Sequence, residues 1–465
     1  MPREILLNAF DMNTVGHIQQ GLWRHPRDQS HRHAELKYWT SLAQTLERGL
    51  FDGLFLADVL GIYDVYGGGP ETALKNAVQI PLGDPMMVIP AMAGVTEHLG
   101  FGVTCTTTYE PPFMFARRMS TLDGLTNGRM GWNIVTGYLD SAARAVGLPV
   151  QVPHDERYDW ADDYLDTVYR LWEGSWEDGA VLADRASGIY TDPTKVHRVQ
   201  GAGRYKMDAA HLCAPTPQRT PVLYQAGASA RGQRFAGEHA ECVFVATPSK
   251  TVLKKTVAAI RQSVAAAGRD PRGVLVFNLQ TVIVDETDAK AKAKYEDYKQ
   301  YIDLDGALAL GSGWMGIDFG TYRLDEPLRH IKTNAVQSSV DAFSSADPSK
   351  VWTVRQLAEW IGIGGLGPLM VGGPAAVADE LQQWVEDTDV DGFNLAYAVT
   401  HETFADIVEH LVPELQKRGA YRTEYASGTL REKLFGAGPR LPATHPAARY
   451  RDLAAVAGRG RAAAE

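Results

Sequence analysis

Polar residues stand at or near the ends of several apolar runs in this chain. Asp58, Thr106, Asn133 and Thr136 occupy such positions, where buried strands are expected to end. One polar residue at a strand end commonly caps the next loop. Several of them on different strands are harder to explain in that way, because active sites of parallel α/β barrels are assembled from these positions. The sequence therefore predicts a ligand site at the carboxyl ends of the strands.

The segment Gln225-Ala226-Gly227-Ala228-Ser229 runs from an apolar stretch into a predicted helix. Small residues let the backbone approach a ligand closely, and a serine at the positive end of a helix can donate its hydroxyl to an anion. An ordinary N-cap serine would give the same text. The segment indicates an anion site only in combination with other features.

His154 and Tyr158 lie four residues apart at the start of another predicted helix, and therefore on one face of it. The acidic residues between them are favoured at a helix start by the helix dipole. From the residues alone, a helix start without a ligand is the simpler interpretation.

Three phenylalanines, Phe10, Phe55 and Phe244, fall near the ends of apolar runs. Most buried aromatic residues belong to the core, but ligand pockets are also mainly apolar. Both interpretations remain open for these three side chains.

Other site motifs are missing from the sequence. His31-Arg32-His33 has no third metal ligand nearby, and we predict no metal site. No Gly-x-Ser-x-Gly elbow or phosphate-binding Walker loop occurs. No Gly-x-Gly-x-x-Gly motif follows the first apolar run, so we expect no dinucleotide fold for NAD(P)H.

Charge and cysteine usage restrict the class of protein further. The 465-residue chain has a formal net charge of −10, which argues against a nucleic-acid partner. Helix-start amides could still hold a phosphate-bearing cofactor. Three cysteines, without a Cys-x-x-Cys pair, are typical of reduced thiols in the cytoplasm. We expect neither a signal peptide nor a membrane span.

Short apolar runs alternate with longer amphipathic segments along the chain. Helices are predicted at about 33–48, 85–98, 111–125, 249–267 and 403–418, with one more from about Ser229. Buried-type strands in this alternation imply a parallel sheet with helices outside it, and eight of them favour a (β/α)8 TIM barrel. The predicted strands are 4–10, 51–58, 101–108, 130–136, 222–226, 242–246, 274–284 and 392–397.

Three stretches interrupt the alternation, at about 137–155, 175–220 and 286–370. In a barrel such insertions are expected over the carboxyl-terminal face, where ligands bind. The last of them includes a charged helix and a glycine-rich stretch, and we interpret it as a lid. We therefore expect a barrel domain over 1–419 and an extended arm over 420–465 that wraps a neighbouring subunit.

The segment 128–136, Gly-Arg-Met-Gly-Trp-Asn-Ile-Val-Thr, is specific enough to suggest a family. Together with Tyr138-Leu139 and 141–144, it resembles the bacterial luciferase-like flavin-dependent monooxygenases. The likeness covers about the whole chain and lies in the branch that includes nitrilotriacetate, dibenzothiophene-sulfone and dimethyl-sulfide monooxygenases. Segments 6–12, 57–66 and 391–400 point to the dimethyl-sulfide subgroup. One departure is Gly137, where the branch often has serine.

The resemblance implies reduced FMN as the cofactor, supplied by a separate NAD(P)H:flavin reductase. It implies that His154, Tyr158 and Ser229 hold the flavin phosphate. The ring would lie against Asp58, Thr106 and Asn133. The full set of implied flavin contacts is Asp58, Thr106, Asn133, Thr136, His154, Tyr158, Gly227, Ala228 and Ser229.

The resemblance implies that reduced FMN and O2 form a flavin C4a-(hydro)peroxide, which oxidatively cleaves a small organic substrate. We expect that substrate, an organosulfur compound among the candidates, to lie between the flavin and Phe10, Phe55 and Phe244. His17 is our candidate acid or base at the rim. We expect a homodimer or homotetramer.

Several other functions remain open from the sequence. Related enzymes cleave aminopolycarboxylates or riboflavin itself, and the same barrel occurs in F420-dependent oxidoreductases. A flavin-binding protein without catalytic activity is a further possibility. Spectra of the bound cofactor and the need for an added reductase would distinguish these classes.

Overall fold

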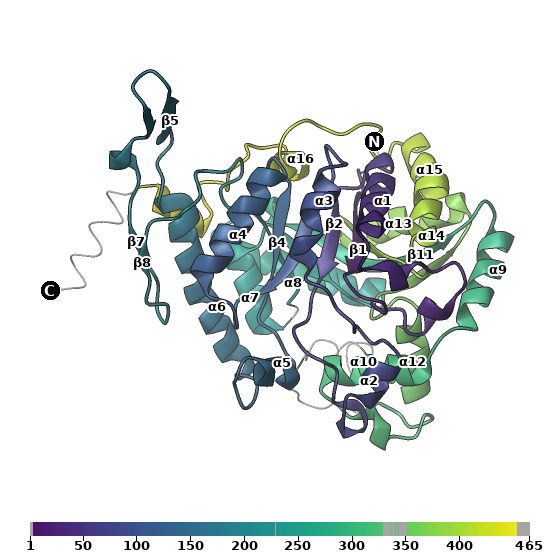
Figure 1. Cartoon of the computed structure of the whole chain (residues 1–465). Helices are drawn as coiled ribbons and strands as arrows, with labels where there is room; N and C mark the ends of the chain where they lie inside the picture. Colours follow the sequence, from purple (N-terminus) through teal and green to yellow (C-terminus); the bar gives the residue numbers. More distant parts are fainter. Residues whose placement is uncertain are drawn as a thin grey trace.

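Eight parallel strands close into a barrel, as the alternation predicted (Figure 1). The computed structural model describes residues 3–227, 229–328, 335, 340, 343 and 351–452. Strand β10 pairs with both β9 and β11, which closes the sheet, and β12 (Leu369–Gly372) pairs with β11 alone among the described strands. The barrel strands are β1 (Leu6–Met12), β2 (Gly53–Ala57), β3 (Gly100–Thr106), β4 (Met130–Val135), β9 (Val222–Gln225), β10 (Cys242–Val245), β11 (Leu275–Val284) and β13 (Gly392–Ala396).

Helices surround the barrel at most of the predicted places. They are α1 (Leu36–Arg48), α4 (Pro112–Leu125), α6 (His154–Tyr169), α7 (Ala230–His239), α8 (Lys250–Ala266), α13 (Pro374–Thr388), α14 (Glu402–Asp406) and α15 (Val412–Lys417). The helix expected over 85–98 is shorter, because regular α-helix is confined to α3 (Ile89–Ala93). Beyond α3, one carboxylate oxygen of Glu47 accepts the amides of Glu97, His98 and Leu99. Side-chain contacts thus replace helical hydrogen bonds there.

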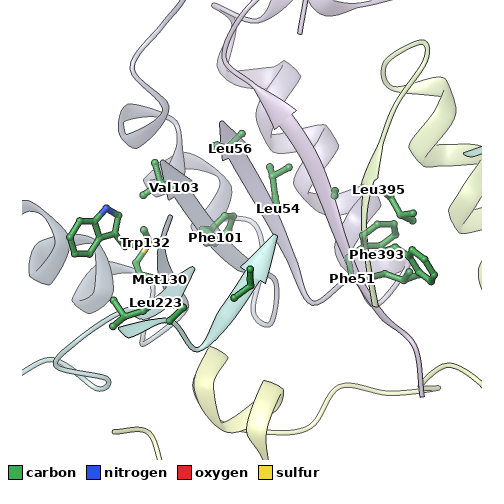
Figure 2. Close-up of a cluster of buried hydrophobic side chains, with 14 of the residues drawn as sticks. Phe51, Leu54, Leu56, Phe101, Val103, Met130, Trp132, Leu223, Phe393 and Leu395 are labelled. Atoms are coloured by element: carbon green, nitrogen blue, oxygen red, sulfur yellow. The ribbon is translucent and has the colours of Figure 1, made fainter. Parts of the chain in front are cut away.

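The main core lies between the outer face of the barrel and the helices. Alternate residues of a strand point to opposite faces, so that Leu54 and Leu56 face outward while Phe55 faces inward. Trp132 illustrates the outer layer, since its ring packs against Phe115 of α4 and Tyr164 of α6. Figure 2 shows side chains of this layer from several neighbouring strands.

The interior of the barrel is filled with aromatic rings. Phe10 stacks on Phe55, Phe55 on Phe244, and Phe244 on Tyr224, with ring centroids 4.4 to 5.1 Å apart. Gly131 of β4 makes room for this stack, because a Cβ atom there would lie 2.2 Å from the Tyr224 ring.

The C-terminal arm closes the amino-terminal end of the barrel of its own chain. Its helix α16 (Leu430–Phe435) places Leu430 and Leu434 against the inner aromatic cluster. Arg431 is buried, donates two hydrogen bonds to the Glu241 carboxylate, and also binds the carbonyl of Pro221 just before β9. The described arm, which extends to Asp452, therefore packs on its own barrel. This weakens one of the two grounds for the predicted oligomer. The other ground, the resemblance to the family, is unaffected, and the oligomer stays a prediction.

Two of the three insertions lie at the carboxyl end of the barrel. Helix α5 (Asp140–Ala145) belongs to the first, and α9 (Asp288–Lys299), α10 (Leu304–Met315) and α12 (Val354–Gly362) belong to the third (Figure 1). Helices α10 and α12 pack together and on Leu139.

The insertion at 175–220 was expected over the carboxyl end, and this placement is wrong for most of it. The connection leaves α6 at the opposite end, so its hairpin of β5 (Val181–Asp184) and β6 (Ile189–Thr191) projects outward there, at the same end of the barrel as α16 (Figure 1). The pair β7 (Val199–Gln200) and β8 (Asp208–Ala209) follows, and Tyr205 between them reaches back to the carbonyl of Thr107. Among the described residues, no helix is long and apolar enough to cross a membrane.

Candidate active site

A pocket of about 240 Å³ opens at the carboxyl ends of β2, β3, β4 and β9. Most of the predicted flavin contacts meet there, although they come from strands and helices far apart in the sequence. The lining includes Asp58, Leu60, Thr104, Thr106, Tyr109, Thr136, Gly137, Tyr138, Leu139, His154, Arg157, Tyr158, Gln225, Gly227 and Ser229. Asn133 lies below this surface, and Ala228 falls outside the described residues.

One end of the pocket gathers hydrogen-bond donors at two helix starts. His154 and Tyr158 share a face of α6, with their rings 5.3 Å apart. His154 Nε2 lies 3.3 Å from the Ser229 hydroxyl, and Ser229 caps α7 by accepting the amide of Gly232. Imidazole, phenol, serine hydroxyl and the positive end of α7 therefore converge on one point, a combination suited to an anion.

Glycines bring the backbone close to the Tyr158 hydroxyl. A Cβ atom on Gly227 would lie 2.5 Å from this oxygen, and one on Gly232 would lie 2.7 Å from it. Burial raises the pKa of Tyr158, so the phenol stays protonated and can donate its hydrogen. Small residues in 225–229 are thus needed for packing against Tyr158, and their close approach to a ligand stays a prediction.

Asp58 occupies the opposite wall. Its carboxylate accepts its neighbour's amide, Val59 N–H, at 3.0 Å. Burial and the negative charge of Asp84 raise the pKa of Asp58 to about 7. Beside it Thr104 and Thr106 face the pocket from β3. Asn133 is buried and donates to the Thr104 hydroxyl at 3.0 Å, so it supports the wall through Thr104.

The segment after β4 forms the roof of the pocket. The carbonyl of Thr136 accepts the Thr108 hydroxyl at 2.7 Å. Gly137 has a φ of 70°, a left-handed conformation that favours glycine, and a Cβ there would lie 3.1 Å from the Tyr109 hydroxyl. The Tyr109 hydroxyl accepts a short hydrogen bond from Gln151. Tyr109 and Gln151 thus lie next to Gly137, the position at which the branch often has serine.

Sequence reasoning missed several lining residues, of which Arg157 and Tyr138 are two. Arg157 lies between the two predicted contacts on α6, is buried, and donates to the carbonyl of Val152 at 2.7 Å. Tyr138 lies 2.6 Å from the hydroxyl of Tyr63, which donates to Gln79. The position of Arg157 within the motif 154–158 was an available signal. The Tyr63–Tyr138 pair joins two loops and left no signal in local spacing.

The remaining predicted residues lie deeper. His17 is buried, with the edge of its ring against Phe10, and burial lowers its pKa to about 3. Its imidazole is therefore uncharged near neutral pH. We expected His17 at the rim of the barrel, and it is instead buried beneath the rim. Phe10, Phe55 and Phe244 form the inner stack and do not line the pocket described above. Their contact with substrate stays a prediction.

Comparison with known proteins identifies relatives over nearly the full length. The chain is 50% identical to the dimethyl-sulfide monooxygenase of Hyphomicrobium sulfonivorans, over 97% of this chain and 95% of that protein. The crystal structure of that enzyme superposes with a TM-score of 0.90, covering 97% and 96% of the two chains.

Identity is also 50% to the long-chain alkane monooxygenase of Geobacillus thermodenitrificans, over 97% and 99% of the two chains. A riboflavin lyase solved with modified FMN and riboflavin is 36% identical, with a TM-score of 0.90 over 97% and 100%. The family model described as luciferase-like monooxygenase matches residues 18–392. By fold, site and sequence, this chain belongs to the luciferase-like monooxygenase family.

Proposed function

We propose that the protein is the oxygenase of a two-component system that uses reduced FMN and O2 to oxidise a small organic molecule. The observation that carries this proposal is the convergence of His154, Tyr158 and Ser229 at the start of α7, in the same pocket as Asp58 and Thr106. One end of the pocket offers donors suited to a phosphate, and the other end offers polar groups suited to the edge of a flavin ring.

The pocket fits FMN by the chemistry of its donors. His154, Tyr158, Ser229 and the buried Arg157 offer hydrogen bonds and positive charge at one end. A phosphate of nearly two negative charges needs such partners in a protein of net charge −10. Reduced FMN supplies the electrons with which O2 is activated for the transfer of one oxygen atom.

The residues of this chain bind and shield the reactants. Tyr158 and Ser229 would donate to the phosphate, while Asp58 and the Thr104–Asn133 pair would orient the ring edge. The Tyr63–Tyr138 pair fixes a hydroxyl on the pocket wall, because Tyr63 already donates to Gln79 and must accept from Tyr138. Helices α10 and α12 pack over this side of the mouth and would limit the access of water.

The lining favours a neutral substrate. Among the described residues of the pocket, the basic side chains are His154, at the end assigned to the phosphate, and Arg157, which already donates to the carbonyl of Val152. Leu60, Leu139 and Ala142 offer an apolar surface elsewhere. We therefore place a small organosulfur compound such as a dialkyl sulfide first. An alkane is the second candidate, because identity to the alkane enzyme is equally high.

Cleavage of an aminopolycarboxylate or of riboflavin, and F420-dependent chemistry, have weaker support. An aminopolycarboxylate would bring several further negative charges, and identity to nitrilotriacetate monooxygenase component A of Aminobacter aminovorans is 35%. Riboflavin cleavage is suggested by one relative at 36% identity. The F420-dependent enzymes are 14% and 15% identical and share only the fold.

Reduced flavin would come from a separate NAD(P)H:flavin reductase. A homodimer or homotetramer in the cytoplasm remains our expectation for the assembly and its location.

The test uses chemically reduced FMN, which makes a reductase unnecessary. Protein and photoreduced FMN are mixed with O2 and, in turn, dimethyl sulfide, a long-chain alkane, nitrilotriacetate or riboflavin, and products are measured. We expect oxidation of a neutral substrate, and none when NADH and oxidised FMN replace reduced FMN. Turnover with NADH and FMN alone, or selective oxidation of nitrilotriacetate, would contradict the proposal.

A further inference from the structure

A second cavity, of about 290 Å³, lies behind Asp58. It shares a wall with the flavin pocket, made of Asp58, Leu60, Thr104 and Thr106. Its other walls are Leu82, Gly83, Asp84, Met86, Cys105, Glu110 and Arg118. Asp58 therefore lines both cavities.

The second cavity leads from Asp58 toward solvent along polar side chains. Asp84 is exposed and accepts the amide of Met86 at 2.8 Å, which fixes its carboxylate at the start of a short 3₁₀-helix, Pro85–Met87. Glu110 and Arg118 form an ion pair on another wall, with side chains 23% and 39% exposed. Water can hydrogen-bond to such a lining. Water can therefore be held along these polar side chains, while Leu60, Leu82 and Met86 make the rest of the lining apolar.

Asp58 has the properties of an acid that can be used near neutral pH. Burial, and after it the negative charge of Asp84, disfavours its ionised form, and its pKa is raised to about 7. The pKa values of Tyr109, Tyr138 and Tyr158, which also line the pocket, are raised by burial from that of an ordinary phenol. These phenols therefore release a proton less readily than Asp58 does.

We propose that Asp58 is the proton donor of the reaction in the flavin pocket, and that the second cavity is the route by which solvent restores its proton. This inference rests on the proposed oxygenase function. When reduced FMN is bound as its anion, FMNH− + O2 + substrate + H+ → FMN + oxidised substrate + H2O takes up one proton per turnover, and the other hydrogen of the water comes from the flavin. In the step assigned to Asp58, its O–H bond breaks, the proton passes to an acceptor in the pocket, and a carboxylate remains. A proton from solvent, relayed through water in the second cavity, then reforms the O–H bond, so that no hydroxide is left behind and Asp58 gains or loses no electrons.

Several charged and titratable groups face Asp58. From the second cavity these are Asp84, Cys105, Glu110 and Arg118. Around the flavin pocket they are Tyr109, Tyr138, His154, Arg157 and Tyr158. Asp84 can be changed without touching the flavin pocket. Asparagine would keep the cap at the start of the 3₁₀-helix while removing the charge, which should lower the pKa of Asp58.

The first experiment titrates aspartate carboxyl groups by ¹³C NMR in protein without flavin. We expect a resonance with a midpoint near 7 that is missing from Asp58→Asn, which distinguishes it from Asp11, whose pKa is also raised to about 7. Asp84→Asn should move this midpoint to lower pH. Asp270→Asn is the matched control, because Asp270 is also exposed and caps another Pro-containing 3₁₀-helix. An unmoved midpoint in Asp84→Asn would overturn the assignment.

The second experiment follows a single turnover with saturating photoreduced FMN as a function of pH. A donor must be protonated, so the rate should fall as pH rises through the pKa of Asp58. Asp84→Asn should move this limb to lower pH by the shift seen in NMR, and Asp270→Asn should not move it. If the pH dependence of the rate stays in place while the NMR midpoint moves, Asp58 is not the proton donor. The proposed oxygenase function would be unaffected by that result. Absence of any oxygenation by the unaltered protein would instead contradict the proposed function, and with it this role.

The third experiment tests the route. Leu82→Phe adds bulk to a residue that lines only the second of the two cavities. The first turnover should keep its rate, because Asp58 begins protonated, while repeated turnover should slow severalfold. Equal rates of repeated turnover in Leu82→Phe and the unaltered protein would show that the proton arrives by another way.

Discussion

His154 Nε2 lies 3.3 Å from the hydroxyl of Ser229, although the two residues are 75 positions apart in the chain. The contact joins the first turn of α6 to the cap of α7 and leaves Tyr158 beside both. Because two helix starts meet there, the phosphate of a flavin would find both donors and favourable dipoles at one point.

Loss of the Tyr158 hydroxyl should weaken binding of FMN but not of riboflavin. A hydrogen bond to a charged group contributes about 1.5–3 kcal/mol. Tyr158→Phe should therefore weaken FMN binding by about tenfold or more, since about 1.4 kcal/mol is one decade. The measurement is an anaerobic titration with reduced FMN and reduced riboflavin, and Tyr190→Phe, an exposed tyrosine of the β5–β6 hairpin, is the control. Equal weakening for both flavins would show that Tyr158 does not hold the phosphate.

A methyl group at Gly232 should disturb the same site. Alanine normally stabilises a helix interior relative to glycine by about 1 kcal/mol. At Gly232, however, the new Cβ would lie 2.7 Å from the Tyr158 hydroxyl and 3.1 Å from the Gly227 backbone. We expect Gly232→Ala to weaken FMN binding by an order of magnitude or more.

Gly124→Ala is the matched control for this change. Gly124 is also in a helix, and a Cβ there meets nothing within 4 Å. It should leave FMN binding unchanged and raise the free energy of unfolding by up to about 1 kcal/mol. Unimpaired FMN binding by Gly232→Ala would mean that Gly232 packs less tightly against Tyr158 and Gly227 than the structure shows.

The strands of the barrel could be predicted from the sequence because each is a short buried run that ends in polar residues. How deep in the barrel a given strand residue lies could not be predicted. Phe10, Phe55 and Phe244 alternate correctly toward the interior, but alternation does not distinguish a ring inside the barrel from one at its mouth. Helix α16 was missed because Leu430, Leu434 and Phe435 are only three apolar positions in an otherwise polar segment. Their partners in the barrel interior lie far away in the sequence.

The arm should contribute strongly to stability through Arg431. Its guanidinium donates to both oxygens of Glu241, and both side chains are almost fully buried. Arg431→Met would leave a buried carboxylate without its partner, which costs about 3–5 kcal/mol. Urea unfolding measures the loss, and Arg198→Met, which breaks an exposed ion pair with Asp208, should cost less than about 1 kcal/mol.

Adding Glu241→Gln to Arg431→Met should restore part of the loss, because it removes the buried charge. If the double variant is no more stable than Arg431→Met, the charge of Glu241 is not the source of the destabilisation.

Buried histidines should make the fold sensitive to acid. Burial lowers the pKa of His211 to about 4, whereas in the unfolded chain it is about 6.5. Between these values the unfolded chain binds the extra proton, so the free energy of unfolding rises with pH and is lost as pH falls. The contribution of His211 is at most about 3 kcal/mol.

His211→Gln should therefore flatten the pH dependence of stability between about pH 4 and 6.5, measured by urea unfolding at several pH values. His31→Gln, an exposed histidine, serves as the control. Slopes identical to those of the unaltered protein would show that His211 is protonated in the folded state at these pH values.

With reduced FMN, and without NAD(P)H or a reductase, this chain should transfer an oxygen atom from O2 to a neutral substrate. The direct measurement is a single turnover of protein and photoreduced FMN with ¹⁸O-labelled O2 and dimethyl sulfide or an alkane, without NAD(P)H or reductase. The proposed function predicts a product that contains one labelled oxygen atom, and loss of most of this product in Tyr158→Phe at limiting FMN. An unlabelled product, or the same yield from NADH and oxidised FMN without a reductase, would contradict it.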